Sequence, residues 1–346
     1  MSTPPSHEAQ RAELHAEVVV RAGVAAEWEL PARHPAALLL TDRNVERVLP
    51  PALRALPRHV LAPGELSKTW AELEGVLQAL DDHGLDRDGL LVCCGGGVVS
   101  DLGGLAAHLH RRGIAWDALP TSVIAQADAA LGGKTAINLG PSKNSVGAFH
   151  AARRVLVDPS FLESLPEVEL RAGFAELLKT AVISGEPLLA ATETLSPQGL
   201  RSAHPEALDV LRRVIDTKLR LVQADPHDHA ERQLLNLGHS FGHAFEALAL
   251  GSLRHGEAVG LGLLCAARLA HDGGQLEARL RAALLRWDLP VRRAGDLGEL
   301  LALMSRDKKR RGGALSLVIP EAPGHVELCP GIAPERAAEG LAAVLA

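Results

Sequence analysis

Three histidines in one stretch of the chain have the types and spacing to bind a divalent cation. His239 and His243 are four residues apart, so on a helix their side chains share one face, one turn apart. His255 follows in the segment RHGE (254–257), where the next loop could bring it to the same cation. Imidazole is a good zinc ligand, and catalytic zinc usually has three protein ligands and an open position. Alternatively, such a pair is polar surface or a hydrogen-bonded pair in the core.

A carboxylate and a lysine elsewhere in the chain could belong to the same site. Glu176 and Lys179 are three residues apart, so on a helix they lie on one face. This spacing usually gives a surface ion pair that contributes less than ~0.5 kcal/mol. Glu176 could instead be a third, anionic metal ligand beside two histidines. The spacing alone leaves both interpretations open.

Glycine-rich segments in the first half of the chain could bind a phosphate or a ribose. Gly95-Gly96-Gly97 lies between an expected strand and an expected helix, where backbone N–H groups could receive a phosphate. It is not the G-x-G-x-x-G fingerprint of dinucleotide sites, and a tight turn that needs positive φ would explain it equally well. The segment 63–68 offers a glycine turn and a carboxylate for ribose hydroxyls, or simply a helix entry with Ser67 or Thr69 as N-cap.

Two further segments carry lysines suited to an anion. Residues 126–144 combine glycines with Lys134 and Lys143, which indicates either a compact anion site or a solvated loop. The basic run at 307–311 is of a kind that is usually solvated, but one of its lysines could close over a phosphorylated substrate.

Composition narrows the class of protein. The chain has 346 residues, 47% hydrophobic and 23% charged, as in ordinary soluble proteins of two domains. A net charge of -6 argues against a nucleic-acid partner. The four cysteines lack metal-site spacing, which indicates reduced thiols in the cytosol. The polar N-terminus and the absence of a long apolar run predict neither a signal peptide nor a membrane span. We therefore expect a cytoplasmic protein.

Hydrophobic patterns predict two domains. Expected strands at 17–21, 36–41, 58–61, 89–94 and 114–119 alternate with helices at 70–83 and 100–112, which is typical of a doubly wound, mostly parallel sheet. After Asp158 the strand signals fade and helical patterns dominate, at 169–184, 205–223 and 232–249. The prediction is a Rossmann-like α/β nucleotide-binding domain of residues 1–158, followed by a mainly α-helical metal- and substrate-binding domain of residues 159–346.

Taken together, these segments resemble the 3-dehydroquinate synthases of the sugar-phosphate cyclase superfamily. The resemblance is collinear from about residue 61 to residue 317. It is carried by PGELSK (63–68), GGGVVSDLGG (95–104), RRGI (111–114), PTSVIAQADAALGGKTAIN (120–138), SKNSVGAF (142–149), AGFAELLK (172–179), RQLLNLGHSFGHAFE (232–246), RHGEAVGLG (254–262) and RDKK (306–309). The chain departs from the family's pattern at Ser100, Ser142 and Thr180-Ala181, without loss of a charged or ligating group.

The resemblance implies a set of site residues. A divalent metal, zinc or cobalt, would be held by Glu176, His239 and His255. NAD would contact Asp42, Asn44, Pro63, Gly64, Glu65, Leu66, Ser67, Lys68, Gly97, Val98, Val99, Ser100, Asp101, Thr121, Ser122, Lys134, Lys143, Phe161, Leu162, Glu163 and Ser164. A phosphorylated keto sugar acid would contact Asp128, Lys134, Asn144, Lys179, Lys218, Arg232, Asn236, His243 and Lys308. The resemblance also implies a homodimer, with Arg112 reaching the phosphate bound in the neighbouring subunit.

The reaction implied by the resemblance releases phosphate from 3-deoxy-D-arabino-heptulosonate 7-phosphate and forms 3-dehydroquinate, in the shikimate pathway of aromatic amino acid biosynthesis. Bound NAD is reduced and reoxidised in each turnover, so the enzyme is a lyase without net redox change. Arg232, assisted by Lys218, matches a substrate carboxylate and argues against cyclases whose substrates lack one. The amino-dehydroquinate synthase branch is left open, although Lys179 leans against it. A metal-dependent NAD(P) alcohol dehydrogenase is a further alternative, which predicts net NADH formation.

Overall fold

The chain folds into two compact units. The computed structural model describes residues 16–140, 142–310 and 315–346, of which 306–310 are described as backbone only. Unit 1 comprises Met1–Leu165 with Arg201–Ala203, and unit 2 comprises Pro166–Leu200 with His204–Ala346. Unit 1 thus extends past residue 158, where we placed the domain boundary. The carboxylate of Asp158 holds the next turn in this unit, because its Oδ1 accepts from the backbone N–H groups of Gly23 and Ser160, at 2.9 and 3.0 Å.

A six-stranded sheet forms the centre of unit 1. All strand pairs are parallel. The order is β1 (Glu17–Val20), β8 (Arg154–Val157), β5 (Ala115–Pro120), β4 (Leu90–Gly95), β2 (Ala37–Asp42) and β3 (Arg58–Leu61). Every residue of β4, with the sequence LLVCCG, is buried, as expected for a parallel strand covered on both faces. The predicted Rossmann-like sheet is therefore confirmed.

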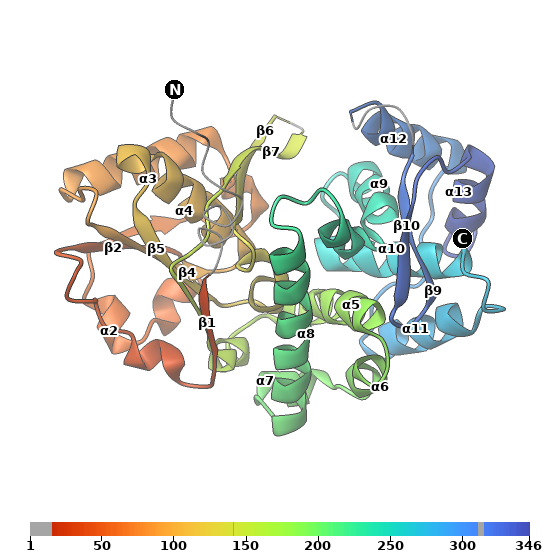
Figure 1. Ribbon diagram of the computed structural model, residues 1–346, viewed down its shortest axis with the longest axis horizontal. Coiled ribbons are helices and arrows are strands. Elements are labelled where there is room, and N and C mark those ends of the chain that lie inside the picture. The colour runs from red at the N-terminus through yellow and green to blue at the C-terminus, as the bar shows by residue number, and fades with distance from the viewer. Residues whose placement is uncertain (1–15, 141, 311–314) are drawn as a thin grey trace. The chain divides into compact units, whose positions relative to one another are not determined.

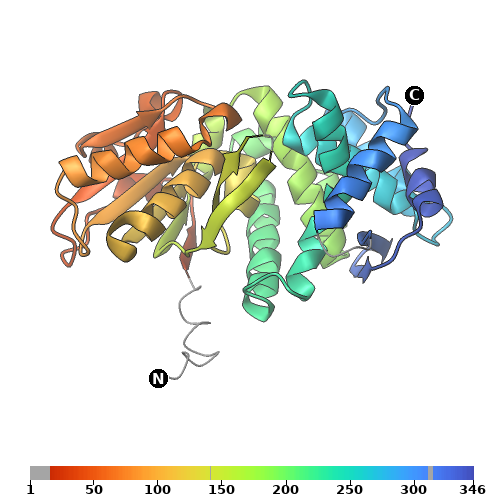
Figure 2. The same cartoon turned by 90° about the horizontal axis from the view of Figure 1, so that it is seen from above.

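Helices cover both faces of this sheet (Figures 1 and 2). One face is covered by α3 (Trp70–Asp82), capped by Thr69, and by α4 (Gly97–Leu109), where a Cβ on Gly103 would lie 2.3 Å from Cys93 Sγ. Side chains of the strands that point to the other face, including Leu39 and Val92, belong to one core cluster. This cluster also contains residues of η1 (Val24–Glu27), η2 (Val45–Val48) and α2 (Pro51–Arg54). Short helices η3 (Glu65–Ser67), η4 (His110–Arg112) and η6 (Pro159–Glu163) complete the connections.

The glycine- and lysine-rich region of unit 1 is ordered into regular structure. It contains η5 (Ala125–Ala129) and an antiparallel hairpin of β6 (Lys134–Leu139) and β7 (Ser142–Phe149). The region is therefore not a loop, although Lys134 and Lys143 are exposed, and an anion site here stays a prediction. A Cβ on Gly147 would lie 2.2 Å from the carbonyl oxygen of Thr135, so the two strands approach too closely for any other residue.

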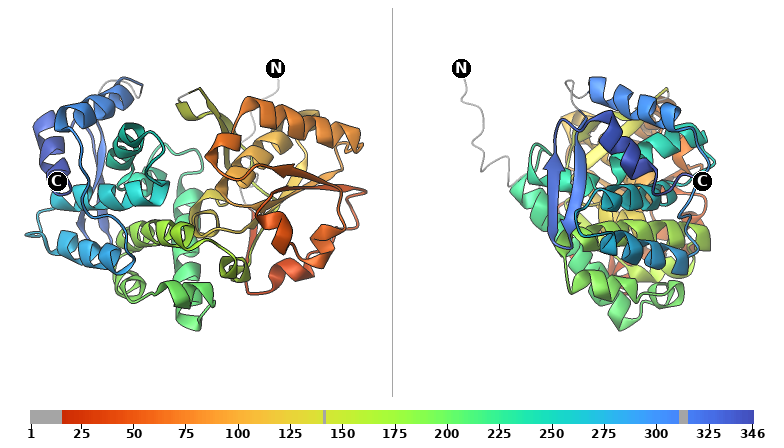
Figure 3. Two further views of the ribbon diagram at one scale, coloured as in Figure 1. Left: turned by 180° about the vertical axis from the view of Figure 1, so that it is seen from behind. Right: turned by 90° about the vertical axis from the view of Figure 1, so that its right-hand side faces the viewer.

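Unit 2 is mainly helical, as predicted. Its helices are α5 (Glu167–Ser184), α6 (Leu188–Glu193), α7 (Pro197–Arg201, ending in unit 1), α8 (Pro205–Ala224), η7 (Glu231–Asn236), α9 (His239–Ala249), α10 (His255–Arg268), α11 (Gln275–Arg286), α12 (Leu297–Arg310) and α13 (Pro334–Leu341). A two-stranded hairpin that the sequence patterns did not predict, β9 (Leu317–Ala322) with β10 (His325–Cys329), packs on α5 and α10 (Figure 3).

The predicted continuous helix over 232–249 is wrong. It is interrupted at Gly238, which has a left-handed φ of 78° and precedes the first residue of α9. A Cβ at this position would lie 3.0 Å from the backbone nitrogen of Leu263 in α10. Close approach of the two helices therefore requires glycine here, and the break makes His239 a helix-terminal residue.

Two features relate to the expectations of reduced cysteines and of no membrane span. All four cysteines are free thiols. Within the described residues, no helix combines the length and the apolar character needed to cross a lipid bilayer.

Candidate functional site

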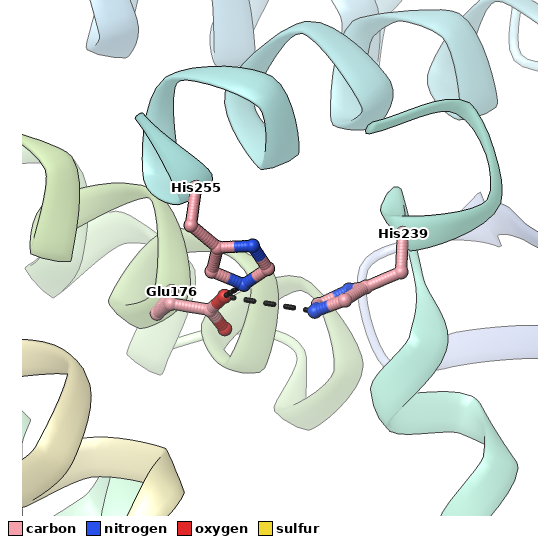
Figure 4. Close-up of side chains that lie close together, drawn as sticks. All are labelled: Glu176, His239 and His255. Atoms are coloured by element: carbon pink, nitrogen blue, oxygen red, sulfur yellow. Dashed lines mark ion pairs between the residues drawn. The ribbon is translucent and has the colours of Figure 1, made fainter. Parts of the chain in front are cut away.

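Three residues from three helices of unit 2 converge as a candidate metal centre (Figure 4). Glu176 lies within α5, His239 is the first residue of α9 and His255 is the first residue of α10. Each offers one ligand atom, and these atoms all lie within 4.8 Å of one another. Glu176 Oε1 is 3.2 Å from His255 Nε2 and 3.7 Å from His239 Nε2.

Glycines bring these helices together by direct backbone contact. A Cβ on Gly256, next to His255, would lie 1.8 Å from the carbonyl oxygen of Ala172 in α5. A Cβ on Gly262 of α10 would lie 1.9 Å from the carbonyl oxygen of Gly238, immediately before α9. Neither position has room for a side chain. The separation of the ligands is therefore set by backbone contacts rather than by adjustable side-chain packing.

The environment of Glu176 suits a residue that coordinates a metal cation. Its side chain is 1% exposed, and neither carboxylate oxygen receives a well-aligned hydrogen bond within the described part of the chain. The facing groups are the two histidines and Lys179, whose Nζ lies 2.6 Å from Oε2. A buried carboxylate with unsatisfied acceptor capacity is costly unless a charge such as a metal ion pairs with it. The surface-pair interpretation of Glu176 and Lys179 is wrong, because both side chains are buried.

The ionisation of Glu176 and His239 suits metal ligands, whereas the pKa of His255 is raised, so its ring must lose a proton when it binds a metal. Burial opposes ionisation of Glu176, but Lys179 and the two histidines outweigh it and hold the pKa of this carboxyl well below its usual range. Burial, reinforced by Lys179, lowers the pKa of His239 well below its ordinary value, so its ring is neutral and retains a lone pair. Burial would also lower the pKa of His255, but the carboxylates of Glu176 and Glu246 outweigh it and raise that pKa to about 9.

Three cations among the predicted substrate residues of unit 2 are buried. Lys179, Lys218 and Arg232 have relative exposures of 1%, 6% and 2%. Cations are rarely buried to this extent, so their concentration in one unit indicates an anionic ligand or internal partners. His243 is exposed, and its ring centroid is 5.5 Å from that of His239. Asn236 ends η7 and is partly buried.

The segment that precedes Arg232 is held by a single carboxylate. Asp225 accepts hydrogen bonds from the backbone nitrogens of His229, Ala230 and Arg232, at 3.0, 2.5 and 3.2 Å. Arg232 Nη1 donates to the carbonyl oxygen of Pro226 at 2.7 Å. Burial opposes ionisation of Asp225, but the three backbone donors outweigh it and lower the pKa of its carboxyl.

The glycine-rich turn of unit 1, residues 95–97, leads into α4, and its backbone is not left-handed. None of Gly95, Gly96 and Gly97 has a positive φ, so the tight-turn interpretation is wrong. Gly95 is required for space instead, because its Cβ would lie 2.4 Å from Val99 Cγ2. Since α4 starts at Gly97, the predicted NAD contacts Gly97, Val98, Val99, Ser100 and Asp101 occupy its N-terminal turns. Their assignment to NAD stays a prediction.

A hydrogen-bond network in unit 1 links predicted cofactor and substrate residues. Lys68 Nζ, on a side chain that is 4% exposed, donates to the carboxylate of Asp101 and to Asn144 Oδ1. Asn138 Oδ1 accepts from the backbone nitrogen of Asn144 at 2.8 Å, and Asn138 Nδ2 donates to Glu65 Oε1 at 2.7 Å. Asn144, at φ 51°, is thereby held by Lys68 and Asn138.

The remaining predicted residues are distributed over unit 1. A cavity of about 280 Å³ is lined by Gly23, Ala25, Ala26, Val48, Pro50, Asp158, Ser160 and the predicted NAD contacts Phe161, Glu163 and Ser164. Leu162 is buried beside them. At the end of β2, Asp42 Oδ1 accepts from the backbone nitrogen of Asn44 at 2.8 Å.

The other predicted positions are as follows. Exposed residues are Pro63, Gly64, Glu65, Leu66, Lys134, Lys143 and Asn144, whereas Ser67 and Thr121 are buried and Ser122 and Asp128 are partly buried. Arg112 is exposed and has a φ of 68°, in a turn that leads into β5. The side chain of Lys308 lies outside the described residues.

The sequence patterns did not identify Glu246, which lies against the metal centre. Its side chain is 8% exposed, and its Oε1 is 3.5 Å from His255 Nδ1. The available signal was its position in α9, since 239, 243 and 246 follow the four-and-three spacing of one helix face.

The chain matches family models and known proteins of one enzyme family. Residues 58–172 match the family model described as 3-dehydroquinate synthase N-terminal, and residues 173–310 match 3-dehydroquinate synthase C-terminal. A 3-dehydroquinate synthase of Leuconostoc citreum is 40% identical over 81% of this chain and 81% of its own length. One from Symbiobacterium thermophilum is 37% identical over 89% of this chain and 90% of its own.

A solved structure is similar over nearly the full length of this chain. The 2-epi-5-epi-valiolone synthase of Streptomyces hygroscopicus subsp. jinggangensis, with NAD+ and Zn2+ bound, has a TM-score of 0.87 and 29% identity over 95% of this chain and 96% of its own. A probable glycerol dehydrogenase of Sinorhizobium meliloti shares the fold, at a TM-score of 0.64 and 19% identity over 94% of this chain and 95% of its own.

Proposed function

Because the chain belongs to the 3-dehydroquinate synthase family, we propose that it converts 3-deoxy-D-arabino-heptulosonate 7-phosphate into 3-dehydroquinate and inorganic phosphate, as an NAD- and metal-dependent lyase. The observation that carries the proposal is the convergence of Glu176, His239 and His255 in the same unit as buried Lys179, Lys218 and Arg232. The four free thiols are consistent with a cytoplasmic location.

The proposed division of labour follows from the residue types. A zinc or cobalt ion on Glu176, His239 and His255 would polarise a ring alcohol, and NAD would accept and return a hydride. Lys179, buried against Glu176, balances the carboxylate charge and presents an ammonium group next to the metal centre. In unit 1, Lys68 holds Asn144 and Asp101 in fixed positions, which orients the predicted cofactor and phosphate contacts before ligands bind.

Phosphate release without NADH accumulation tests the reaction. Incubation with the heptulosonate phosphate, NAD and zinc or cobalt should release phosphate without a lasting rise in absorbance of reduced nicotinamide. Net NADH formation from a simple alcohol, with no phosphate release, would replace the proposal by an alcohol dehydrogenase.

A substrate carboxylate is proposed to bind Arg232, with Lys218 as a second cation. The guanidinium fork matches a carboxylate in a bidentate manner, and burial strengthens such a pair. Arg232→Ala should lower kcat/KM by roughly 10–100-fold, since hydrogen bonds to charged groups contribute ~1.5–3 kcal/mol. Arg232→Lys should recover only part of this loss, because an ammonium group does not reproduce the fork.

The similarity to 2-epi-5-epi-valiolone synthase favours a second candidate, another sugar-phosphate cyclase of secondary metabolism. The amino-dehydroquinate synthase branch belongs to the same group of alternatives. An unchanged kcat/KM in Arg232→Ala would favour a cyclase whose substrate lacks a carboxylate. Comparing the oxygen substrate with its amino analogue would separate the two carboxylate-bearing branches.

We also propose a homodimer in which Arg112 reaches the phosphate bound in the partner subunit. The exposed position of Arg112 is consistent with this role, but a helix-terminal cation would be placed similarly. The test mixes Arg112→Ala chains with His255→Ala chains and allows the subunits to exchange. A residue acting across the interface leaves one intact site in each heterodimer, so activity returns. If verified heterodimers stay inactive, Arg112 acts within its own chain. If Arg112→Ala protein is fully active by itself, Arg112 has no role in the reaction.

A further inference from the structure

Glu246 lies on the side of His255 that faces away from the other metal ligands. We propose that Glu246 is a positioning residue, which accepts the Nδ1 proton of His255 and thereby fixes this imidazole with Nε2 directed at the metal. The proposal rests on the metal site of the proposed function and extends it to a residue outside the ligand set.

The two nitrogens of His255 have carboxylates on opposite sides. Nε2 is 3.2 Å from Glu176 Oε1, whereas Nδ1 is 3.5 Å from Glu246 Oε1. A metal-bound imidazole almost always donates its other N–H to a carboxylate or carbonyl oxygen, which fixes the tautomer and raises the basicity of the ligand. Glu246 is the carboxylate in that place, and its 8% side-chain exposure limits competition from water.

Helix α9 explains why Glu246 reaches a ligand on another helix. His239 and Glu246 are seven residues apart, and therefore lie two turns apart on one face of α9. This face meets the start of α10, because Gly242 allows close approach: a Cβ there would lie 3.0 Å from the carbonyl oxygen of Ala258. A single helix thus supplies one ligand directly and supports the second ligand through Glu246.

The two histidines are supported by different groups. The Nδ1 of His239 lies 3.3 Å from the carbonyl oxygen of Leu237, a backbone group that side-chain substitution leaves in place. The corresponding support of His255 is a side chain and can be removed. Because His255 is also the more exposed ligand, at 36% against 14% for His239, it depends more on this support.

The test measures metal affinity in the full-length protein, independently of turnover. Glu246→Ala should weaken binding of Zn2+ by about 10–100-fold in chelator competition, the usual effect of losing such a partner. Glu246→Gln, which retains the shape without the charge, should fall between Ala and wild type. In both variants the Co2+-loaded protein should show a changed visible absorption spectrum, because the donor strength of His255 changes.

Glu257→Gln is the matched control. Glu257 lies two residues after His255 and accepts from the backbone nitrogen of Arg254 at 2.8 Å, so it supports the start of α10 through Arg254. This variant should lose some stability but keep wild-type metal affinity and the wild-type Co2+ spectrum. The melting temperature of metal-free protein separates folding from binding, and it should change little in Glu246→Gln.

Each outcome decides the matter. Wild-type Zn2+ affinity and an unchanged Co2+ spectrum in both Glu246 variants would overturn the proposal. So would a weakened affinity that Glu257→Gln reproduces, since the effect would then be general to the helix. If the wild-type protein bound no stoichiometric metal, the proposed metal site itself would fail. If metal binding followed expectation but no phosphate were released, only the proposed reaction would fail.

Discussion

The predicted site residues of the two units are held in different ways. In unit 2 the candidate ligands sit on helices that touch through backbone at Gly256 and Gly262, and Glu176 is almost fully buried. In unit 1 the predicted contacts Lys134 and Asn144 are exposed on a hairpin that side-chain hydrogen bonds attach to its neighbours. The candidate metal centre is therefore built as part of a core, whereas the predicted contacts on the hairpin are exposed and depend on side-chain hydrogen bonds. Substitutions should have different consequences in the two units.

The largest effect is expected for removal of a ligand. His255→Ala should lose about one equivalent of metal and nearly all turnover, because a three-ligand site with one ligand missing holds the cation poorly. Elemental analysis after dialysis measures the metal directly. His271→Ala, which removes an exposed histidine paired with Glu321, is the control and should keep its metal. Full metal content in His255→Ala would contradict the ligand assignment.

Next in size is a change that leaves every ligand in place but separates the helices. In Gly256→Ala the new methyl group would lie 1.8 Å from the Ala172 carbonyl oxygen, so α10 must move away from α5 and carry His255 with it. We expect weaker metal binding and a loss of roughly 1–3 kcal/mol in the free energy of unfolding. In Gly260→Ala, on the same helix, the nearest atom to the new methyl group is the flexible end of Leu284 at 3.1 Å, so the effect should be smaller. Equal metal affinities in the two variants would show that backbone contact does not set the ligand geometry.

A substitution in unit 1 should leave the metal centre intact. Lys68→Met removes the donor shared by Asp101 and Asn144, leaving two polar groups without it. We expect a loss of about 1–3 kcal/mol in unfolding free energy and weaker NAD binding, measured by denaturation and by calorimetry. Metal content should equal that of wild type. A parallel loss of metal would mean that the two sites depend on each other and that the contrast drawn above is wrong.

The smallest effect concerns pH and the segment before Arg232. Because the pKa of Asp225 is lowered in the folded protein, its carboxylate contributes stability above the unfolded-state pKa of about 3.9, and this contribution is lost as pH falls through the folded-state pKa. The difference in unfolding free energy between wild type and Asp225→Asn should therefore be largest near neutral pH and shrink in acid. A difference that is independent of pH would argue against an ionised Asp225 as the anchor.

Local patterns in the sequence were sufficient for most of the regular structure. The alternation of apolar runs and helical periodicity predicted five of the sheet's strands and the long helices α3, α5 and α8, because these patterns report burial on one face or two. They failed where backbone contact decides the structure. The break at Gly238 and the hairpin of β6 and β7 depend on glycines that allow close approach of another backbone segment. Hydrophobic periodicity does not indicate which segment will lie there.

The candidate site likewise has features that the sequence predicted and features that only the tertiary structure decided. By itself, the sequence determined that His239 and His243 share a helix face, since that relation depends only on the helical repeat, and the motif resemblance supplied the ligand set. Only the tertiary structure brought Glu176, His239 and His255 within reach of one cation and set Glu246 against His255. The physical reason is that sequence spacing constrains neighbours within one helix. Distances between helices depend on how closely their backbones approach.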